Sequence, residues 1–341
     1  MNSKKKILLT GGAGYIGAHT AVELIEQGFN VVLIDDFSKS DNSLLSGVEK
    51  ITGKKLNFVE GDCKDADLLD QLFSKEKFDS VIHFAAYKSV NESVREPLMY
   101  YDNNLRSMTE LLRAMANNNV NEFIFSSSCT VYGQPDLVPV DESASFKKAE
   151  SPYGATKQMC ERFLEDITAV NKNLKAISLR YFNPIGAHPS ALIGELPIGA
   201  PNNLVPYITQ TAIGLREKLV VFGSDYKTPD GSCVRDFIHV VDLAQAHVRA
   251  VEKINDMPSN NEAFNIGSGN GETVLGLVKK FIEVTGVKLN YEIGPRRAGD
   301  IEKVYANPAK SKKLLGWQTK LSIEESLRDA WKWEKELSLK K

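Results

Sequence analysis

Two side chains that could move a proton together stand four residues apart in the segment 151–157. Tyr153 and Lys157 would lie one turn apart on one face of a helix, and Pro152 suits the first turn of that helix. A phenol titrates at about 10 and is a poor base at neutral pH, but a cation about 4 Å away contributes roughly 4 kcal/mol, or about three pKa units. The pair therefore predicts a proton-transfer group. The pattern is short, and taken alone it favours an ordinary amphipathic helix that happens to contain both residues.

A glycine loop supplies the first context for this pair. An apolar strand at residues 7–10 is followed by Gly11, Gly14 and Gly17 and then by a helix, the arrangement that lets backbone approach a pyrophosphate at the positive end of a helix. Asp35 ends the second expected strand, where a carboxylate accepts from ribose hydroxyls and repels a 2′-phosphate, so NAD is favoured over NADP. The cofactor-binding residues expected in this region are Gly11, Gly14, Tyr15, Ile16, Gly17, Asp35 and Asp36.

Further candidates follow the next strands, at the carboxyl ends where ligands of parallel sheets bind. Asp62 is expected near the adenine, the small Ala85 and Ala86 would let a cofactor lie against backbone, and Lys88 would meet a phosphate or a ribose hydroxyl. The candidates after the third and fourth strands are Asp62, Cys63, Phe84, Ala85, Ala86 and Lys88. The run 126–128 is all serine and closes the fifth strand, where a hydroxyl could face the phenol of Tyr153.

Strand and helix patterns alternate through the first half of the chain, with continuous apolar strands. This alternation predicts an α/β fold with a doubly wound, parallel Rossmann-type sheet covered on both faces. After residue 182 the alternation breaks, and residues 184–235 contain many of the Pro and Gly residues. We expect residues 1–183 to form an NAD-binding domain to which segments near 237–267 return, and residues 184–341 to form mainly a smaller, substrate-binding lobe.

Composition limits the partners and the compartment. The 341 residues are 42% hydrophobic and carry a formal net charge of −2, which gives no general attraction to nucleic acid or to an anionic membrane. No apolar run approaches the length of a signal-peptide core or a membrane span. Four scattered cysteines and five histidines form no metal-binding array. We therefore expect reduced thiols, no metal site, no nucleic-acid or membrane partner, and a cytoplasmic location.

Three longer stretches accompany these motifs: residues 128–133 read SCTVYG, residues 180–189 read RYFNPIGAHP, and residues 234–239 read VRDFIH. With the glycine loop, the serine run and the Tyr153/Lys157 pair, the chain resembles the extended short-chain dehydrogenase/reductase superfamily. Within that superfamily it closely resembles the UDP-glucose 4-epimerase family over nearly its whole length.

The resemblance implies an isomerase of galactose and related carbohydrate metabolism, with tightly bound NAD and transient oxidation at C4′ of a UDP-sugar. It implies that Tyr153 is the acid/base at the 4′-hydroxyl, that Lys157 tunes it and holds the nicotinamide ribose, and that Ser128 shares the 4′-oxygen. Further cofactor positions implied are Asn103, Ser126 and Tyr181. The substrate-binding positions implied are Ser128, Tyr153, Asn183, Asn203, Leu204, Phe222, Arg235, Arg297, Asp300 and Val304. Two arginines suit the diphosphate of such a substrate physically as well.

The resemblance also bears on assembly and on the sugar. It implies a homodimer through helices near residues 97–117 and 153–169. Some epimerases restricted to UDP-glucose and UDP-galactose have Tyr at the position matching Val304, and a small residue there can leave room for a 2-acetamido group. We therefore hypothesise that UDP-N-acetylglucosamine and UDP-N-acetylgalactosamine are additional substrates, the alternative being that Val304 only packs against its loop.

Two other functions share the fold. A nucleotide-sugar 4,6-dehydratase would also use NAD and the Tyr/Lys pair, but relatives place Asp-Glu where this chain has Cys129 and Thr130. A non-catalytic NAD-sensing regulator would generally lose the Tyr/Lys pair, which is intact here.

Overall fold

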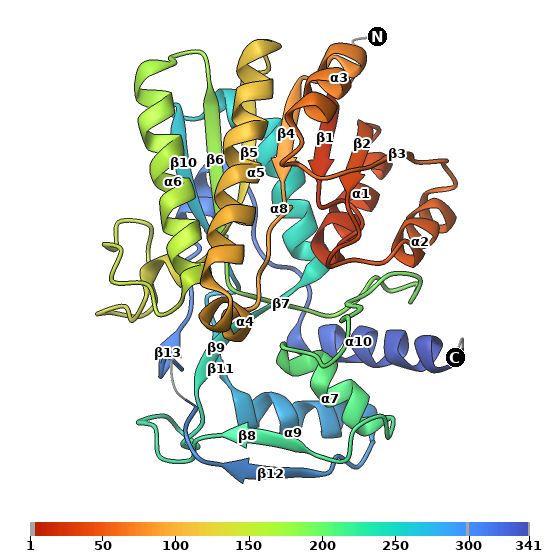
Figure 1. Ribbon diagram of the computed structural model, residues 1–341. Helices are drawn as coiled ribbons and strands as arrows, with labels where there is room; N and C mark the ends of the chain where they lie inside the picture. The colour runs from red at the N-terminus through yellow and green to blue at the C-terminus, as the bar shows by residue number, and fades with distance from the viewer. Residues whose placement is uncertain (1–3, 298–299, 340–341) are drawn as a thin grey trace.

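A computed structural model describes residues 4–297 and 300–339. Its centre is a seven-stranded sheet in the order β10-β6-β5-β4-β1-β2-β3 (Figure 1), in which all neighbouring strands run parallel. The predicted doubly wound Rossmann-type sheet is confirmed. Its strands are β1 (Lys6–Thr10), β2 (Asn30–Asp35), β3 (Asn57–Glu60), β4 (Ser80–His83), β5 (Glu122–Ser128), β6 (Lys175–Tyr181) and β10 (Asn261–Ile266).

Helices cover both faces of this sheet because successive side chains of each buried strand point to opposite sides. Ile7 and Leu9 of β1 enter one core, and Leu8 between them enters the other. The helices on the Ile7 face are α1 (Tyr15–Glu26), α2 (Ser43–Thr52) and α8 (Val240–Lys253). Those on the Leu8 face are α3 (Ala66–Glu76), α5 (Pro97–Asn117) and α6 (Pro152–Val170).

A second group of elements lies below the carboxyl ends of the large sheet in Figure 1 and has a core of its own, which includes Ile208, Phe281 and Leu327. Its helices are α7 (Leu204–Ala212), α9 (Val274–Thr285) and α10 (Ile323–Ser338). Its strands are β7 (Asn183–Ile185), β8 (Leu219–Phe222), β9 (Val234–His239), β11 (Gly271–Thr273), β12 (Tyr291–Gly294) and β13 (Lys303–Val304). The remaining helical segments are α4 (Val90–Arg95), η1 (Cys129–Tyr132), η2 (Ile254–Asp256) and η3 (Ser311–Leu315). A domain division at residue 183 stays a prediction, as does the return of the segment 237–267, within which α8 and β10 lie.

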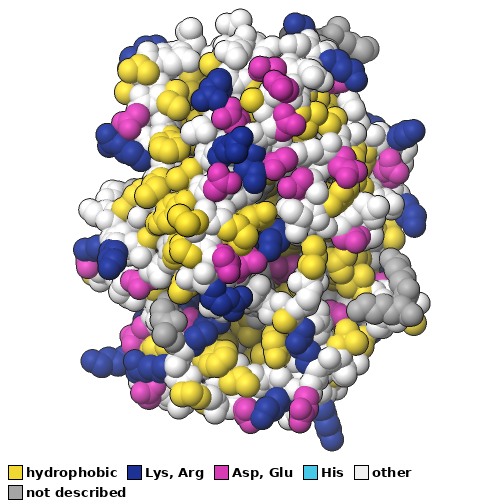
Figure 2. All heavy atoms as spheres, in the orientation of Figure 1, with side chains coloured by type: hydrophobic (Ala, Val, Ile, Leu, Met, Phe, Trp, Pro, Cys, Tyr) yellow, Lys and Arg dark blue, Asp and Glu magenta, His cyan; other side chains and the backbone are white. Residues whose placement is uncertain are grey.

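The order of the strands reverses between β1 and β4, so their carboxyl ends border the crevice where such sheets bind ligands. Acidic and basic side chains are interspersed on the face seen in Figure 2, in keeping with the small net charge. In the described part of the chain, no helix combines the length and the apolar character needed to cross a membrane.

Candidate active site

The amino-terminal turns of α6 carry Tyr153 and Lys157. The helix begins at Pro152, and the Ser151 hydroxyl caps it by accepting a 3.2 Å hydrogen bond from the amide of Gly154. Tyr153 and Lys157 are both nearly fully buried, being 9% and 4% exposed. The Lys157 ammonium donates to the backbone carbonyl of Ser126 at 2.5 Å, which ties the helix to the end of β5.

Burial controls the protonation of this pair. It raises the pKa of Tyr153 to about 12, while a hydrogen bond with the Ser128 hydroxyl acts in the opposite direction. It lowers the pKa of Lys157 to about 8. The Lys157 Nζ atom lies 5.9 Å from the centre of the Tyr153 ring. The expected lowering of the Tyr153 pKa by about three units is not seen in this arrangement, because burial is the largest effect and raises it.

The glycine loop connects β1 to α1 and packs so closely against neighbouring backbone that side chains at Gly11 and Gly17 would not fit. Gly11 has φ +68°, and a Cβ there would lie 2.8 Å from the amide nitrogen of Ala85. A Cβ on Gly17 would lie 2.2 Å from the carbonyl oxygen of Gly11. Gly14 precedes α1 and offers no capping side chain, so amides of the first turn, at Tyr15 and Ile16, are left for an anion. These residues fit the pyrophosphate of a dinucleotide.

Asp35 is held by the loop around it. Its carboxylate accepts from the amides of Ala13 and Phe37, each at 3.0 Å, and from the Ser40 hydroxyl at 2.6 Å. Burial raises the pKa of Asp35, and these hydrogen bonds oppose the rise. Asp36 beside it binds the amide of Ser38 at 2.9 Å and is exposed. The buried carboxylate thus stands at the end of β2, where a ribose would lie.

The predicted adenine side is formed by the turn after β3. The Asp62 carboxylate lies 3.5 Å from the ammonium of Lys64, and its side chain is 42% exposed. Cys63 is buried, and burial raises the pKa of its thiol. The thiol is therefore protonated and acts as a small apolar group.

The turn after β4 lies against the glycine loop. The amide of Ala85 donates to the Thr10 hydroxyl at 3.2 Å, which fixes this turn to the end of β1. The Phe84 ring packs on His247 with 4.7 Å between ring centres. Ala85 and Ala86 are both only partly buried, so these two small residues are accessible from outside the protein core.

Two of the predicted nicotinamide positions, Ser126 and Tyr181, lie near Tyr153. The hydroxyls of Ser126 and Tyr181 hydrogen-bond to each other, and the side chain of Asn103 donates to Asn104 at 3.1 Å. The negative charge that Tyr153 would carry raises the pKa of Tyr181, after burial as the larger cause. Tyr181, Ser126 and Tyr153 are thus neighbours.

A carboxylate that no motif had indicated connects two predicted ligand residues. Glu195 accepts from the side-chain amide of Asn203 at 2.5 Å, and its carboxylate lies 3.4 Å from the Lys88 ammonium. Lys88 follows β4 and Asn203 precedes α7, so Glu195 joins the large sheet to the lower group of elements. Burial and the charge of Glu195 both raise the pKa of Tyr15.

The predicted diphosphate ligands lie in the lower group. Asp300 sits 2.7 Å from Arg297 and 3.8 Å from Arg235, so two guanidinium groups share one carboxylate. Arg235 also donates to the Ile301 carbonyl at 2.6 Å. The Arg297 guanidinium lies 5.4 Å from the centre of the Phe222 ring, which is 39% exposed. The cluster has excess positive charge close to an accessible aromatic face.

Three predicted sugar-site residues differ in their surroundings. The side-chain oxygen of Asn183 is buried and has no hydrogen-bond partner among the described residues. Leu204 is the first residue of α7. Val304 is 4% exposed and packs in a small apolar cluster with Val131 and Phe182.

Comparisons with known proteins agree with this geometry. Residues 7–267 match the model of the NAD dependent epimerase/dehydratase family. The chain is 49% identical to a UDP-glucose 4-epimerase of Yersinia enterocolitica over 96% of this chain and 97% of that protein.

Solved structures are equally similar. A Stenotrophomonas maltophila UDP-glucose-4-epimerase with bound NAD and formylated UDP-arabinopyranose superposes with a TM-score of 0.96 at 45% identity, covering 99% of this chain and 100% of that one. A Bifidobacterium longum UDP-glucose 4-epimerase in complex with NAD⁺ and UDP gives 0.94 at 42% identity, covering 97% and 98%. The chain therefore belongs to the NAD dependent epimerase/dehydratase family and, within it, to the UDP-glucose 4-epimerases.

Proposed function

We propose that this chain interconverts UDP-galactose and UDP-glucose through Tyr153, Lys157 and Ser128. The observation that carries this assignment is the meeting of the three side chains at the end of β5. Ser128 hydrogen-bonds the phenol, and Lys157 is anchored on the next turn of the same helix. These groups also adjoin Tyr181, on the side where the glycine loop and Asp35 fit a dinucleotide.

The roles follow from the chemistry of each group. Tyr153 accepts the proton of the sugar 4′-hydroxyl and returns it after the ketone has turned over, as a general base and then a general acid. Ser128 holds the 4′-oxygen in line with the phenol, and the Lys157 cation favours the phenolate. Bound NAD⁺ supplies the hydride acceptor and donor at C4′.

The charged residues sort into binding roles. Arg235 and Arg297, which both contact the Asp300 carboxylate, bind the diphosphate of the substrate in place of that carboxylate. Asn183 offers an unpaired buried oxygen to a sugar hydroxyl, and the exposed ring of Phe222 lies beside Arg297 on the uridine side. The Asp35 carboxylate accepts hydrogen bonds from the hydroxyls of the adenosine ribose.

The test is turnover of UDP-galactose by the purified protein, with product measured as UDP-glucose and the cofactor followed by its absorbance. Wild type should form product, and Tyr153→Phe should lower kcat by about 10²-fold to 10⁴-fold while still binding UDP. Equal kcat in Tyr153→Phe would refute the role of the phenol. A 4,6-dehydratase would instead release water from its substrate, and a regulator would form no product.

We also propose that the enzyme epimerises UDP-N-acetylglucosamine and UDP-N-acetylgalactosamine. Support comes from the small side chain of Val304, on the strand β13 that pairs with Arg235 of β9. The residue thus adjoins the predicted diphosphate site.

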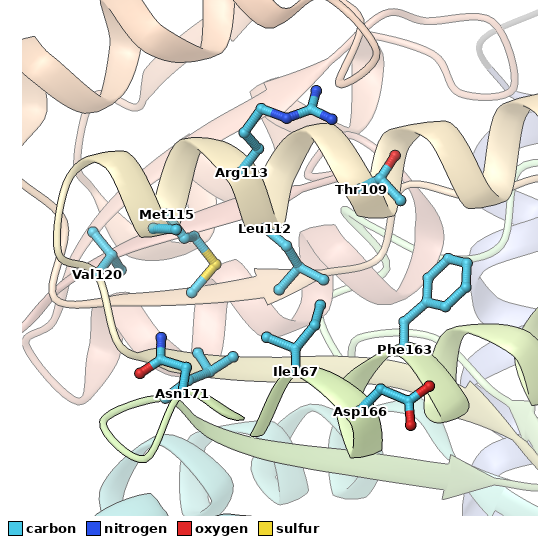
Figure 3. Close-up of a pocket in the computed structure, with 11 residues that line it drawn as sticks. Thr109, Leu112, Arg113, Met115, Val120, Phe163, Asp166, Ile167 and Asn171 are labelled. Carbon is cyan, nitrogen blue, oxygen red and sulfur yellow. The ribbon is translucent and has the colours of Figure 1, made fainter. Parts of the chain in front are cut away.

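Assembly as a homodimer through α5 and α6 is a further part of the proposal. A groove of about 390 Å³ lies between these helices, and Figure 3 shows side chains of both helices pointing into it. Its lining is mostly apolar and includes Leu112, Met115, Phe163 and Ile167. Burying such a groove against a second copy would remove apolar surface from water. We further propose a cytoplasmic location, supported by four cysteines that are all unpaired.

A further inference from the structure

A buried ion pair lies one turn beyond Lys157 on the same face of α6. Glu161 and Arg180 are 8% and 7% exposed. Arg180 donates to the carboxylate from Nε at 3.0 and 3.1 Å and from Nη2 at 2.6 Å. Because α6 has 3.6 residues per turn, Tyr153, Lys157 and Glu161 form one continuous stripe facing the sheet.

This stripe contacts three consecutive residues of β5. Lys157 binds the carbonyl of Ser126, and Glu161 accepts from the hydroxyl of Ser127 at 2.5 Å. The phenol of Tyr153, the first residue of the stripe, hydrogen-bonds to the side chain of Ser128. Three turns of the helix are therefore fixed against three adjacent positions of one strand.

Arg180 extends the contact to other elements. It donates to the Tyr132 hydroxyl at 2.9 Å, and its guanidinium lies 4.9 Å from the centre of the Phe146 ring. Tyr132 in turn donates to the side chain of Asn265 on β10 at 2.7 Å. The ion pair thus joins α6 to β5, β6, η1 and β10.

Removing two charges from water costs several kcal/mol per ion, and such pairs are often no more stabilising than apolar residues of the same size. A buried pair at this place therefore suggests a role beyond stability. We propose that Glu161, supported by Arg180, is a positioning residue that sets α6 against β5 and supplies the counter-charge of Lys157. This inference rests on the proposed function, since it assigns Lys157 as the cation beside the acid/base.

The surroundings of Lys157 support a charge effect. The titratable and charged groups near it are Tyr153, Cys160 and Glu161 on α6, His83 on β4, and, one contact further away, Tyr181 and Arg180 on β6. Burial lowers the pKa of Lys157, while Cys160 and Glu161 raise it. The buried neighbour His83 has a pKa of about 3, lowered mainly by burial, and is neutral at physiological pH. Glu161 is then the carboxylate among these groups.

The test is the substitution Glu161→Gln, which keeps the shape and removes the charge. We expect the pKa of Lys157, measured by NMR of the ¹³Cε-labelled lysine in the protein without substrate, to fall by about one unit. The alkaline limb of the kcat profile should move to lower pH by the same amount. The matched control is Glu165→Gln, one turn further along α6, where Glu165 is exposed and pairs with Arg162 at 3.1 Å. That control should leave both readouts unchanged.

If Glu161→Gln fails to fold because Arg180 is left as an unpaired buried charge, the double variant Glu161→Gln/Arg180→Gln replaces it, since it contains neither charge. It should recover thermal stability, and the pKa of Lys157 should stay below that of wild type but fall less than in Glu161→Gln, because the more distant charge of Arg180 is removed as well. An unchanged Lys157 pKa in whichever of these variants folds would overturn the proposal. The NMR titration needs no turnover, so failure of the proposed function and failure of this inference give different results.

Discussion

At the scale of single residues, burial rather than the neighbouring charge is the main influence on the protonation of the proposed catalytic pair, Tyr153 and Lys157. The pKa of Tyr153 is raised to about 12 and that of Lys157 is lowered to about 8, in each case mainly by burial. At pH 7 the phenol is neutral and the amine is charged. A base function of Tyr153 therefore needs positive charge beyond that of Lys157, and the cationic nicotinamide of bound NAD⁺ would supply it.

Val304 carries the prediction on sugar specificity. Its side chain is 4% exposed inside a small apolar cluster. A tyrosine at this position would therefore displace its neighbours or extend into the adjoining predicted substrate site. Val304→Tyr should lower kcat/KM for UDP-N-acetylgalactosamine by at least about tenfold more than for UDP-galactose. The measurement is a comparison of the four UDP-sugars in both proteins. No turnover of acetamido sugars by wild type would contradict the idea.

At the scale of elements, the turn from β1 into α1 depends on backbone contact. A Cβ on Gly17 would lie 2.2 Å from the Gly11 carbonyl, so Gly17→Ala must move the loop. We expect a loss of about 1–3 kcal/mol in the free energy of unfolding, measured by urea denaturation, together with loss of copurified NAD.

Gly154→Ala is the matched control for this change. A Cβ on Gly154 would meet its nearest neighbours at 3.4–3.5 Å, an ordinary contact, in the first turn of α6. Because alanine favours helix over glycine by about 1 kcal/mol, this variant should be as stable as wild type or slightly more stable. A similar loss of stability in the two variants would mean that the close approach at Gly17 has no special importance.

The elements around the site could be predicted because their signals are local. Continuous apolar strands, the glycine loop and Pro152 indicated the parallel sheet and the start of α6. Glu161 and Arg180 were missed because they are 19 positions apart and pair only in the fold, and Glu195 because its partner Lys88 is 107 positions away. The Lys157 contact with Ser126 joins residues 31 positions apart. Only the packing of α6 on β5 reveals this contact. The same packing buries Tyr153 and raises its pKa, whereas the sequence pattern had predicted a lowered pKa.

At the scale of the whole molecule, the groove between α5 and α6 predicts assembly. Phe163→Glu places a charge in a mostly apolar groove and should convert a dimer to monomers, because an unpaired charge is costly to bury. Sedimentation velocity measures the outcome. Leu215→Glu, at a side chain that is 51% exposed and outside the groove, should leave the dimer intact. A wild-type monomer would refute this assembly.

Three buried histidines, His19, His83 and His247, contribute to the response of the whole fold to acid. Burial lowers the pKa of His19 to about 3, of His83 to about 3 and of His247 to about 4. A base with a lowered folded pKa binds fewer protons in the native state, so its stability contribution is complete above about pH 6.5 and is lost as the pH falls. Buried acids such as Glu23, whose pKa burial raises to about 7, act in the opposite direction and gain stability as the pH falls.

Because these effects oppose each other, a single histidine gives the sharpest prediction. The Nδ1 atom of His247 donates to the carbonyl of Leu243 at 2.9 Å, and its Nε2 is buried without a partner among the described residues. An added proton would therefore be an unsolvated charge. Between pH 7 and pH 5, wild type should lose about 2 kcal/mol more unfolding free energy than His247→Leu, from urea denaturation at both pH values. His188→Leu, where the histidine is only partly buried, should change this pH difference less. An equal pH difference in wild type and His247→Leu would show that the ring is charged or solvated at pH 5, contrary to its place between Phe84 and Tyr181.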